Sequence, residues 1–97
     1  MRVVLHAPTA DALIRARSNL KNLLAADPDA EVRIIANADA VPAAIQNPDA
    51  ETDAHLLLCE KTLKNRGLTA PPEFSTVPAA IQELARLQAD GWAYIRA

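Results

Sequence analysis

The sequence predicts a three-layer α/β/α domain on a five-stranded, mainly parallel sheet. Three observations lead to this prediction. Short apolar runs rich in β-branched residues and leucine, without polar alternation, indicate strands that are covered on both faces. Segments with apolar residues at helical spacing separate these runs. An alternation of strand and helix favours parallel strands joined by helical crossovers.

Two strands and one long helix are expected at the start of the chain. Residues 2–6 (RVVLH) form the first strand. Thr9 is a capping residue for a helix whose apolar spacing continues until Asp27-Pro28 stops it. Residues 31–36 (EVRIIA) form the second strand, which ends at Asn37.

The middle of the chain contains shorter elements. Asp39 is expected to cap a short helix, and residues 48–53 are expected to be a solvated loop because they carry acids and no large apolar side chain. Residues 54–58 (AHLLL) form the third strand, which runs directly into Cys59. A helix over residues 60–66 follows, with a glycine placed for a left-handed C-terminal cap.

The last third repeats the pattern. Residues 74–77 form the fourth strand, and Pro78 opens a helix that Gly91 ends. Residues 92–96 form the final strand, in which Trp92 and Tyr94 share a face expected to be core or subunit interface. The inward face of the helix is predicted to consist of Ile81, Leu84, Ala85 and Gln88.

Length and composition indicate one domain, residues 1–97, with a small core. Alanine accounts for 21 of the hydrophobic residues, and each buries far less apolar area than a leucine. Only Phe74, Trp92 and Tyr94 are aromatic. We therefore expect a homo-oligomer that shares apolar surface between subunits.

Charge and cysteine content restrict the partners and the compartment. The net charge is −2, without the basic stripe that nucleic acid binding needs, so no nucleic acid partner is expected. The opening apolar run is broken by His6 and Pro8, so neither a signal peptide nor a membrane span is expected. A lone cysteine fits a reducing compartment, and we expect a cytoplasmic protein.

Several familiar site motifs are missing. Gly67 and Gly91 are the only glycines and are best explained as helix caps, which excludes a dinucleotide fingerprint and a phosphate loop. One cysteine with His6 and His55 at opposite ends of different strands does not make a zinc site. No serine lies in a nucleophile elbow. We expect no metal and no cofactor, and a flavodoxin-like electron carrier is disfavoured.

Cys59 is the candidate catalytic residue because of its position. It ends a parallel strand, where open α/β sheets bind ligands, and it precedes a helix whose first N–H groups favour a thiolate. Lys61 adds positive charge, whereas Glu60 opposes it. The competing interpretation, which stays open, is that Cys59 is a small, buried and inert apolar residue.

His6 and Asn37 are expected at the same edge of the sheet as Cys59. If the first three strands are neighbours in order, His6 lies roughly 10 Å from Cys59 with Asn37 between them. His6 is then a pocket-rim or structural residue rather than an ion-pair partner of the cysteine.

Four segments resemble the DsrE/DsrF-like family, which includes the YchN and TusD types. They are NLKNLL, EVRIIANADAV, LLLCEKTLKNRGL and VPAAIQELARLQADGWAYI, and they follow the family order over nearly the whole chain. The segment NPDAETD departs from the longer helix that relatives often carry there. The resemblance implies a three-layer sheet, as already expected, and a trimeric or hexameric assembly.

In the sulfur-transfer branch of this family, the cysteine that matches Cys59 carries sulfane sulfur as a persulfide between donor and acceptor proteins. The resemblance therefore implies a sulfur-relay protein in which Cys59 bears the persulfide. In this hypothesis Asn37 and His6 line the pocket, and Lys61 helps to bind an anionic partner. The alternative is a non-catalytic oligomeric scaffold or small-ligand-binding module of the same fold. The sequence does not identify the sulfur donor, the acceptor, the pathway or the subunit number.

Overall fold

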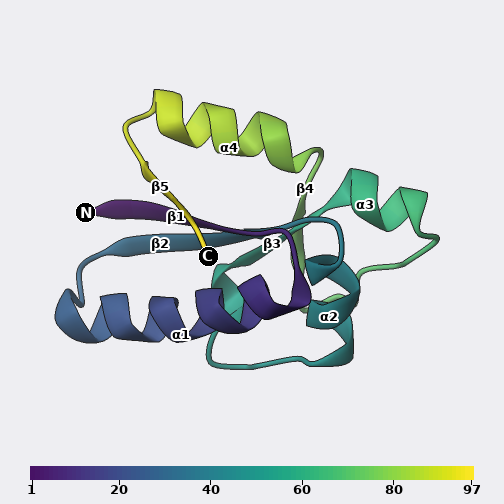
Figure 1. Ribbon diagram of the computed structural model, residues 1–97, viewed down its shortest axis with the longest axis horizontal. Helices are drawn as coiled ribbons and strands as arrows, with labels where there is room; N and C mark the ends of the chain where they lie inside the picture. The colour runs from purple at the N-terminus through teal and green to yellow at the C-terminus, as the bar shows by residue number, and fades with distance from the viewer.

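The computed structural model describes all 97 residues and has five strands and four α-helices. The strands are all parallel and lie in the order β4-β3-β2-β1-β5. Helices α1 and α2 cover one face of the sheet and α4 covers the other (Figure 1). This arrangement confirms the predicted α/β fold. The elements are β1 (Arg2–Ala7), α1 (Ala10–Ala26), β2 (Glu31–Ala36), α2 (Ala40–Gln46), the 3-10 turn η1 (Asp53–His55), β3 (Leu56–Cys59), α3 (Glu60–Asn65), β4 (Ser75–Val77), α4 (Ala80–Ala89) and β5 (Ala93–Arg96).

The two faces of the sheet are covered very unequally. The face toward α1 and α2 carries a cluster of 19 buried apolar residues, whereas the face toward α4 carries seven. Alternate residues of each strand point to opposite faces, so every central strand contributes to both clusters. The α4 layer is therefore thin, and parts of that face remain open.

Two of the predicted helix ends are confirmed in atomic detail. The Thr9 side chain accepts a hydrogen bond from the backbone N–H of Ala12 at 3.0 Å, which is the expected N-cap of α1. Gly67 follows α3 with φ +64°, the left-handed conformation that glycine adopts without strain. No helix is long and apolar enough to cross a membrane.

The segment between α2 and β3 differs from the solvated loop expected over residues 48–53. Thr52 is fully buried, and the Asp53 side chain is only 11% exposed. The Asp53 carboxylate accepts hydrogen bonds from Arg17 at 2.9 Å and from the backbone N–H of Asp49 at 2.7 Å. The sequence prediction was wrong here because Arg17, on a distant helix, neutralises Asp53 and permits its burial.

Asp39 lies at the expected N-cap position of α2, but its side chain caps nothing. Its backbone is already helical, with φ −64° and ψ −20°, and its carboxylate pairs with Arg66 at 2.7 Å. Asp39 therefore joins α2 to the end of α3, a role that the local sequence does not reveal.

Helix α4 packs with a face different from the predicted one. Ile81 is 77% exposed, and Ala85 and Gln88 are also exposed. Of the predicted inward set, only Leu84 is buried. The buried residues of this helix are Ala80, Leu84 and Leu87, which have equally good helical spacing. The helix is therefore rotated by about one residue relative to the predicted orientation.

We expect Leu87→Ala to destabilise the protein by about 2–5 kcal/mol, because Leu87 is 1% exposed. Its cluster is too small to close around the cavity that the substitution would create. Ile81→Ala is the matched control on the same helix and should change the free energy of unfolding by less than about 0.5 kcal/mol. Urea denaturation of both variants checks this. A larger loss from Ile81→Ala would contradict the observed orientation of α4.

Candidate functional site

The carboxyl ends of three neighbouring strands bring the predicted site residues to one edge of the sheet. Strands β1, β2 and β3 are consecutive neighbours in the sheet, which is the order assumed for the expected distance between His6 and Cys59. Ala36 pairs with Leu58, so the residues that follow, Asn37 and Cys59, leave their strands at adjacent positions. His6 lies on β1 beside them, with its Cα opposite Ile35.

The sulfur of Cys59 lies between the first turns of two helices. Cys59 is the last residue of β3 and the residue that precedes α3. The backbone N–H of Ala80, the first residue of α4, donates to Cys59 Sγ at 3.4 Å. The sequence indicated the first of these helices but not the second. Only the parallel pairing of Cys59 with Val77 on β4 brings the start of α4 to the sulfur.

Two opposing effects act on the pKa of the Cys59 thiol. Burial alone raises the pKa, because the interior disfavours the charged thiolate. Hydrogen bonds from the backbone of Thr62, Ala80 and Lys61 and from the Thr62 hydroxyl outweigh burial and hold the pKa below its usual value. Of these donors, only the Ala80 N–H has full hydrogen-bonding geometry; the two α3 amides and the Thr62 hydroxyl approach the sulfur more loosely. The surroundings of Cys59 therefore make the thiolate easier to form.

Thr62 links the cysteine to the turn after β2. Its hydroxyl oxygen accepts a hydrogen bond from the backbone N–H of Ala38 at 3.1 Å. Ala38 has φ +48°, a left-handed conformation that costs an L-residue roughly 1–2 kcal/mol. The hydrogen bond from Ala38 to Thr62 offsets part of this strain, by about 1 kcal/mol. The strained turn after Asn37 is thereby fastened to the helix that begins at Cys59.

His6 is held from both sides by hydrogen bonds. Its Nε2 lies 3.0 Å from Asn37 Oδ1, and its Nδ1 lies 2.7 Å from the Tyr94 hydroxyl. Asn37 Oδ1 can only accept, so Nε2 carries the proton and the Tyr94 hydroxyl donates to Nδ1 when the ring is neutral. The structure therefore brings His6 and Asn37 together as expected. It adds Tyr94, which the sequence indicated only as a core or interface residue.

Lys61 lies outside this row of side chains. It is exposed in the first turn of α3, and it acts on the sulfur through its backbone amide. The neighbouring Glu60 accepts a hydrogen bond from the Thr76 hydroxyl at 2.6 Å, which joins α3 to β4. Neither side chain forms an ion pair.

The sulfur is nearly closed off from solvent in the single chain. Cys59 is 5% exposed and belongs to the seven-residue cluster beneath α4. None of the three cavities is lined by Cys59, Asn37, His6 or Lys61. No cluster of His, Cys, Asp and Glu side chains has the geometry of a metal site. The site is therefore a buried thiol that accepts hydrogen bonds beneath the start of α4, and it is not an open pocket.

Comparisons with known proteins support the fold and leave the function open. No protein-family model and no curated protein matches the chain. A solved structure of a protein of unknown function from Methanobacterium thermoautotrophicum superposes with a TM-score of 0.84 at 23% sequence identity. The match covers 99% of this chain and 98% of the other. The whole chain therefore has the fold of that structure.

The Cys59 thiolate should form at a lower pH in the folded protein than in the same protein unfolded in urea, because the surrounding hydrogen-bond donors lower the pKa of the thiol. Thr62→Val removes the hydroxyl donor and should raise the pH midpoint of thiolate formation. Lys61→Ala keeps the backbone amide and should leave that midpoint unchanged. Thiolate ultraviolet absorbance measures this without any reagent entering the site, and Cys59→Ala gives the background. A midpoint in the folded wild-type protein at or above that of the unfolded protein would contradict the lowered pKa.

Neutral His6 should carry its proton on Nε2. Long-range nitrogen–proton NMR spectra distinguish the two tautomers, and His55 is the only other imidazole in the chain. Tyr94→Phe removes the hydroxyl that donates to Nδ1 and should shift that nitrogen toward the frequency of an unbonded ring. A proton found on Nδ1 of the neutral wild-type ring would show that the arrangement with Asn37 and Tyr94 is reversed.

Proposed function

We propose that this protein is a sulfur carrier that holds sulfane sulfur as a persulfide on Cys59. The observation that supports the proposal is the convergence of N–H and O–H donors on a single sulfur, which lowers the pKa of the Cys59 thiol despite its burial. A thiolate is the nucleophilic form of cysteine, and fixed amide donors stabilise negative charge on sulfur.

The transfer step needs no cofactor. The Cys59 thiolate attacks the outer sulfur of a donor persulfide, R–S–SH, and forms a new S–S bond. The bond between the two donor sulfurs breaks, and the donor leaves as the thiolate R–S⁻. The products are Cys59–S–SH and R–S⁻, so charge is conserved, the proton stays on the transferred sulfur and no external oxidant is required. An acceptor thiolate repeats the same exchange in the next step.

The residues beside Cys59 have distinct roles in this proposal. The hydrogen bond from His6 engages Asn37 Oδ1 and leaves the amide NH₂ of Asn37 without a hydrogen-bond partner in the protein. That NH₂ is a donor for an outer sulfur attached to Cys59. Lys61, exposed on α3, supplies positive charge toward an acidic face of a donor or acceptor protein.

Loading of Cys59 requires movement of the segment that covers it. Ala79 and Ala80 are buried over the sulfur, whereas Pro78 is exposed. Breaking one N–H to sulfur contact at the start of α4 and displacing these small side chains would open a path. Because the α4 cluster holds only seven residues, local opening is less costly there than on the opposite face.

A second function is favoured by the same burial. At 5% exposure and with no adjoining cavity, Cys59 also fits an oligomeric scaffold or ligand-binding module in which the thiol only packs. The exposed apolar residues available to other subunits are Met1, Ile14, Ile81, Tyr94 and Ile95. Homo-oligomerisation remains a prediction in both cases, whereas sulfur donor and acceptor partners are predicted only for the carrier.

Incubation with a low-molecular-weight sulfane donor, followed by intact-protein mass spectrometry, tests the carrier function. We expect wild-type protein to gain one sulfur and Cys59→Ala to gain none. Thr62→Val should load more slowly, since it loses a donor to the sulfur. The absence of an adduct on wild-type protein, or an equal adduct on Cys59→Ala, would remove the proposal.

Native alkylation rates separate the two candidate functions. If Cys59 opens locally, iodoacetamide should react faster than global unfolding allows, and mild denaturant should change that rate little. If Cys59 only packs, the alkylation rate should follow the free energy of unfolding across a denaturant series. The Leu87→Ala variant, with its weakened α4 layer, should accelerate the reaction in either case and serves as the positive control.

A further inference from the structure

A solvent-connected cavity lies on the α4 side of the sheet and extends from the amino ends of β2 and β3 to Val77, the β4 residue that pairs with Cys59. Its volume is about 410 Å³, within the range of small-molecule sites. Three polar side chains line it: Arg33 from β2, His55 from η1 and Glu83 from α4. The complete lining is Val32, Arg33, Ala54, His55, Leu57, Val77 and Glu83.

Arg33 is the one arginine of this chain that has neither a hydrogen-bond partner nor an ion-pair partner. The other six arginines each donate at least one hydrogen bond to a carboxylate or a backbone carbonyl. Arg33 donates none and forms no ion pair, although it is half-buried. Taking a guanidinium partly out of water without a partner is unfavourable, so an anion in the cavity would stabilise it.

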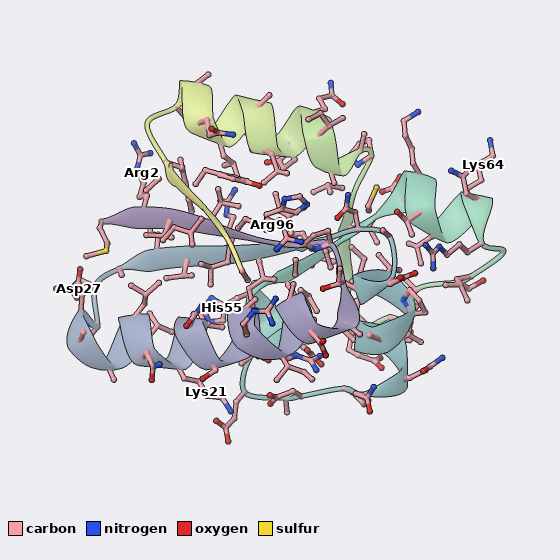
Figure 2. The ribbon with its side chains drawn as sticks, viewed as in Figure 1. Arg2, Lys21, Asp27, His55, Lys64 and Arg96 are labelled. Atoms are coloured by element: carbon pink, nitrogen blue, oxygen red, sulfur yellow. The ribbon has the colours of Figure 1, made fainter.

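Trp92 fixes the position of the Arg33 guanidinium. The Cζ atom of Arg33 lies 4.7 Å from the centre of the Trp92 ring, and Trp92 is only 7% exposed. Arg2 also lies near this ring, at 5.8 Å, beside the connection from α4 to β5 (Figure 2). In a cation–π contact the guanidinium lies over the face of the aromatic ring, and the N–H groups of Arg33 donate no hydrogen bond to the protein. Those N–H groups match the two oxygens of a carboxylate or phosphate.

The remaining polar groups of the cavity do not cancel the charge of Arg33. Glu83 is engaged by Arg86, one helical turn along α4. His55, labelled in Figure 2, donates from Nδ1 to the carbonyl of Val32 at 3.0 Å, which leaves Nε2 without a protein partner. Leu57 and Val77 supply an apolar wall. The cavity combines one unpaired cation with an apolar surface.

We propose that this cavity binds a small organic oxyanion, a carboxylate or a phosphate monoester, with its charged head on Arg33 and its apolar part against Leu57 and Val77. Cys59 does not line this cavity, and occupancy of the cavity does not depend on sulfur chemistry.

Trp92 is the only tryptophan and lies against Arg33, so its fluorescence reports on the site directly. Butyrate and butyl phosphate are the probes, titrated at constant ionic strength, and butylammonium is the control with the same apolar body and the opposite charge. We expect saturable binding of at least one anion and none of butylammonium. Arg33→Gln should weaken binding at least about tenfold, because it removes a charge-assisted hydrogen-bonding pair.

Arg66→Gln is the matched control, since Arg66 is exposed and already paired with Asp39. It should leave the affinity unchanged. Calorimetry repeats the titrations, because Arg33→Gln also alters the surroundings of Trp92. Arg33→Lys keeps the charge without the planar fork and should weaken binding several-fold, which preserves a comparison if Arg33→Gln unfolds. The proposal is overturned if neither anion binds saturably. It is also overturned if the Arg33 variants bind the anions as tightly as the wild-type protein does, or if butylammonium binds as well as the anions.

Discussion

The consecutive parallel pairing of β1, β2 and β3 is the constraint on which the candidate site depends. Parallel strands joined by crossovers all end at one edge of the sheet, and their side chains alternate between its faces. His6, Asn37 and Cys59 therefore meet at a single edge, on the face that α4 covers. Pairing of β4 with β3 then brings the start of α4 to Cys59. A shift of one residue in any of these pairings would turn the side chains of that strand to the opposite face.

The unequal thickness of the two helical layers explains two features that look unrelated. Nineteen buried apolar residues fill the face toward α1 and α2, and only seven fill the face toward α4. Helix α4 covers Cys59 with its first residue, Ala80, and borders the cavity beside Arg33 with Glu83 without filling it. The same face thus holds a protected thiol and a half-buried cation.

Local sequence signals succeeded where a residue acts on its own neighbours and failed where a distant residue decides. Thr9 caps α1 and Gly67 ends α3 as predicted, since both depend on backbone geometry within a few residues. Asp53 was expected in solvent, but Arg17 pairs with it from another helix. Ile81 was expected inside, but two helical faces share Leu84 and have equally good spacing, so the sequence could not choose between them. The choice was made by the packing of Leu87 and Ala80 against the sheet.

The sequence by itself determined the order of strands and helices and the position of Cys59 at the end of β3, and it placed His6 and Asn37 at one edge on the condition that the first three strands are neighbours. These follow from hydrophobic periodicity and from the geometry that parallel crossovers impose. Only the tertiary structure decided that Tyr94 is hydrogen-bonded to His6 and that Ala80 donates to the sulfur. It also decided that Arg33 lines a cavity and has no hydrogen-bond or ion-pair partner there. Each of these contacts joins residues at least 21 positions apart or depends on what a helix leaves uncovered, and no local pattern encodes such a distance.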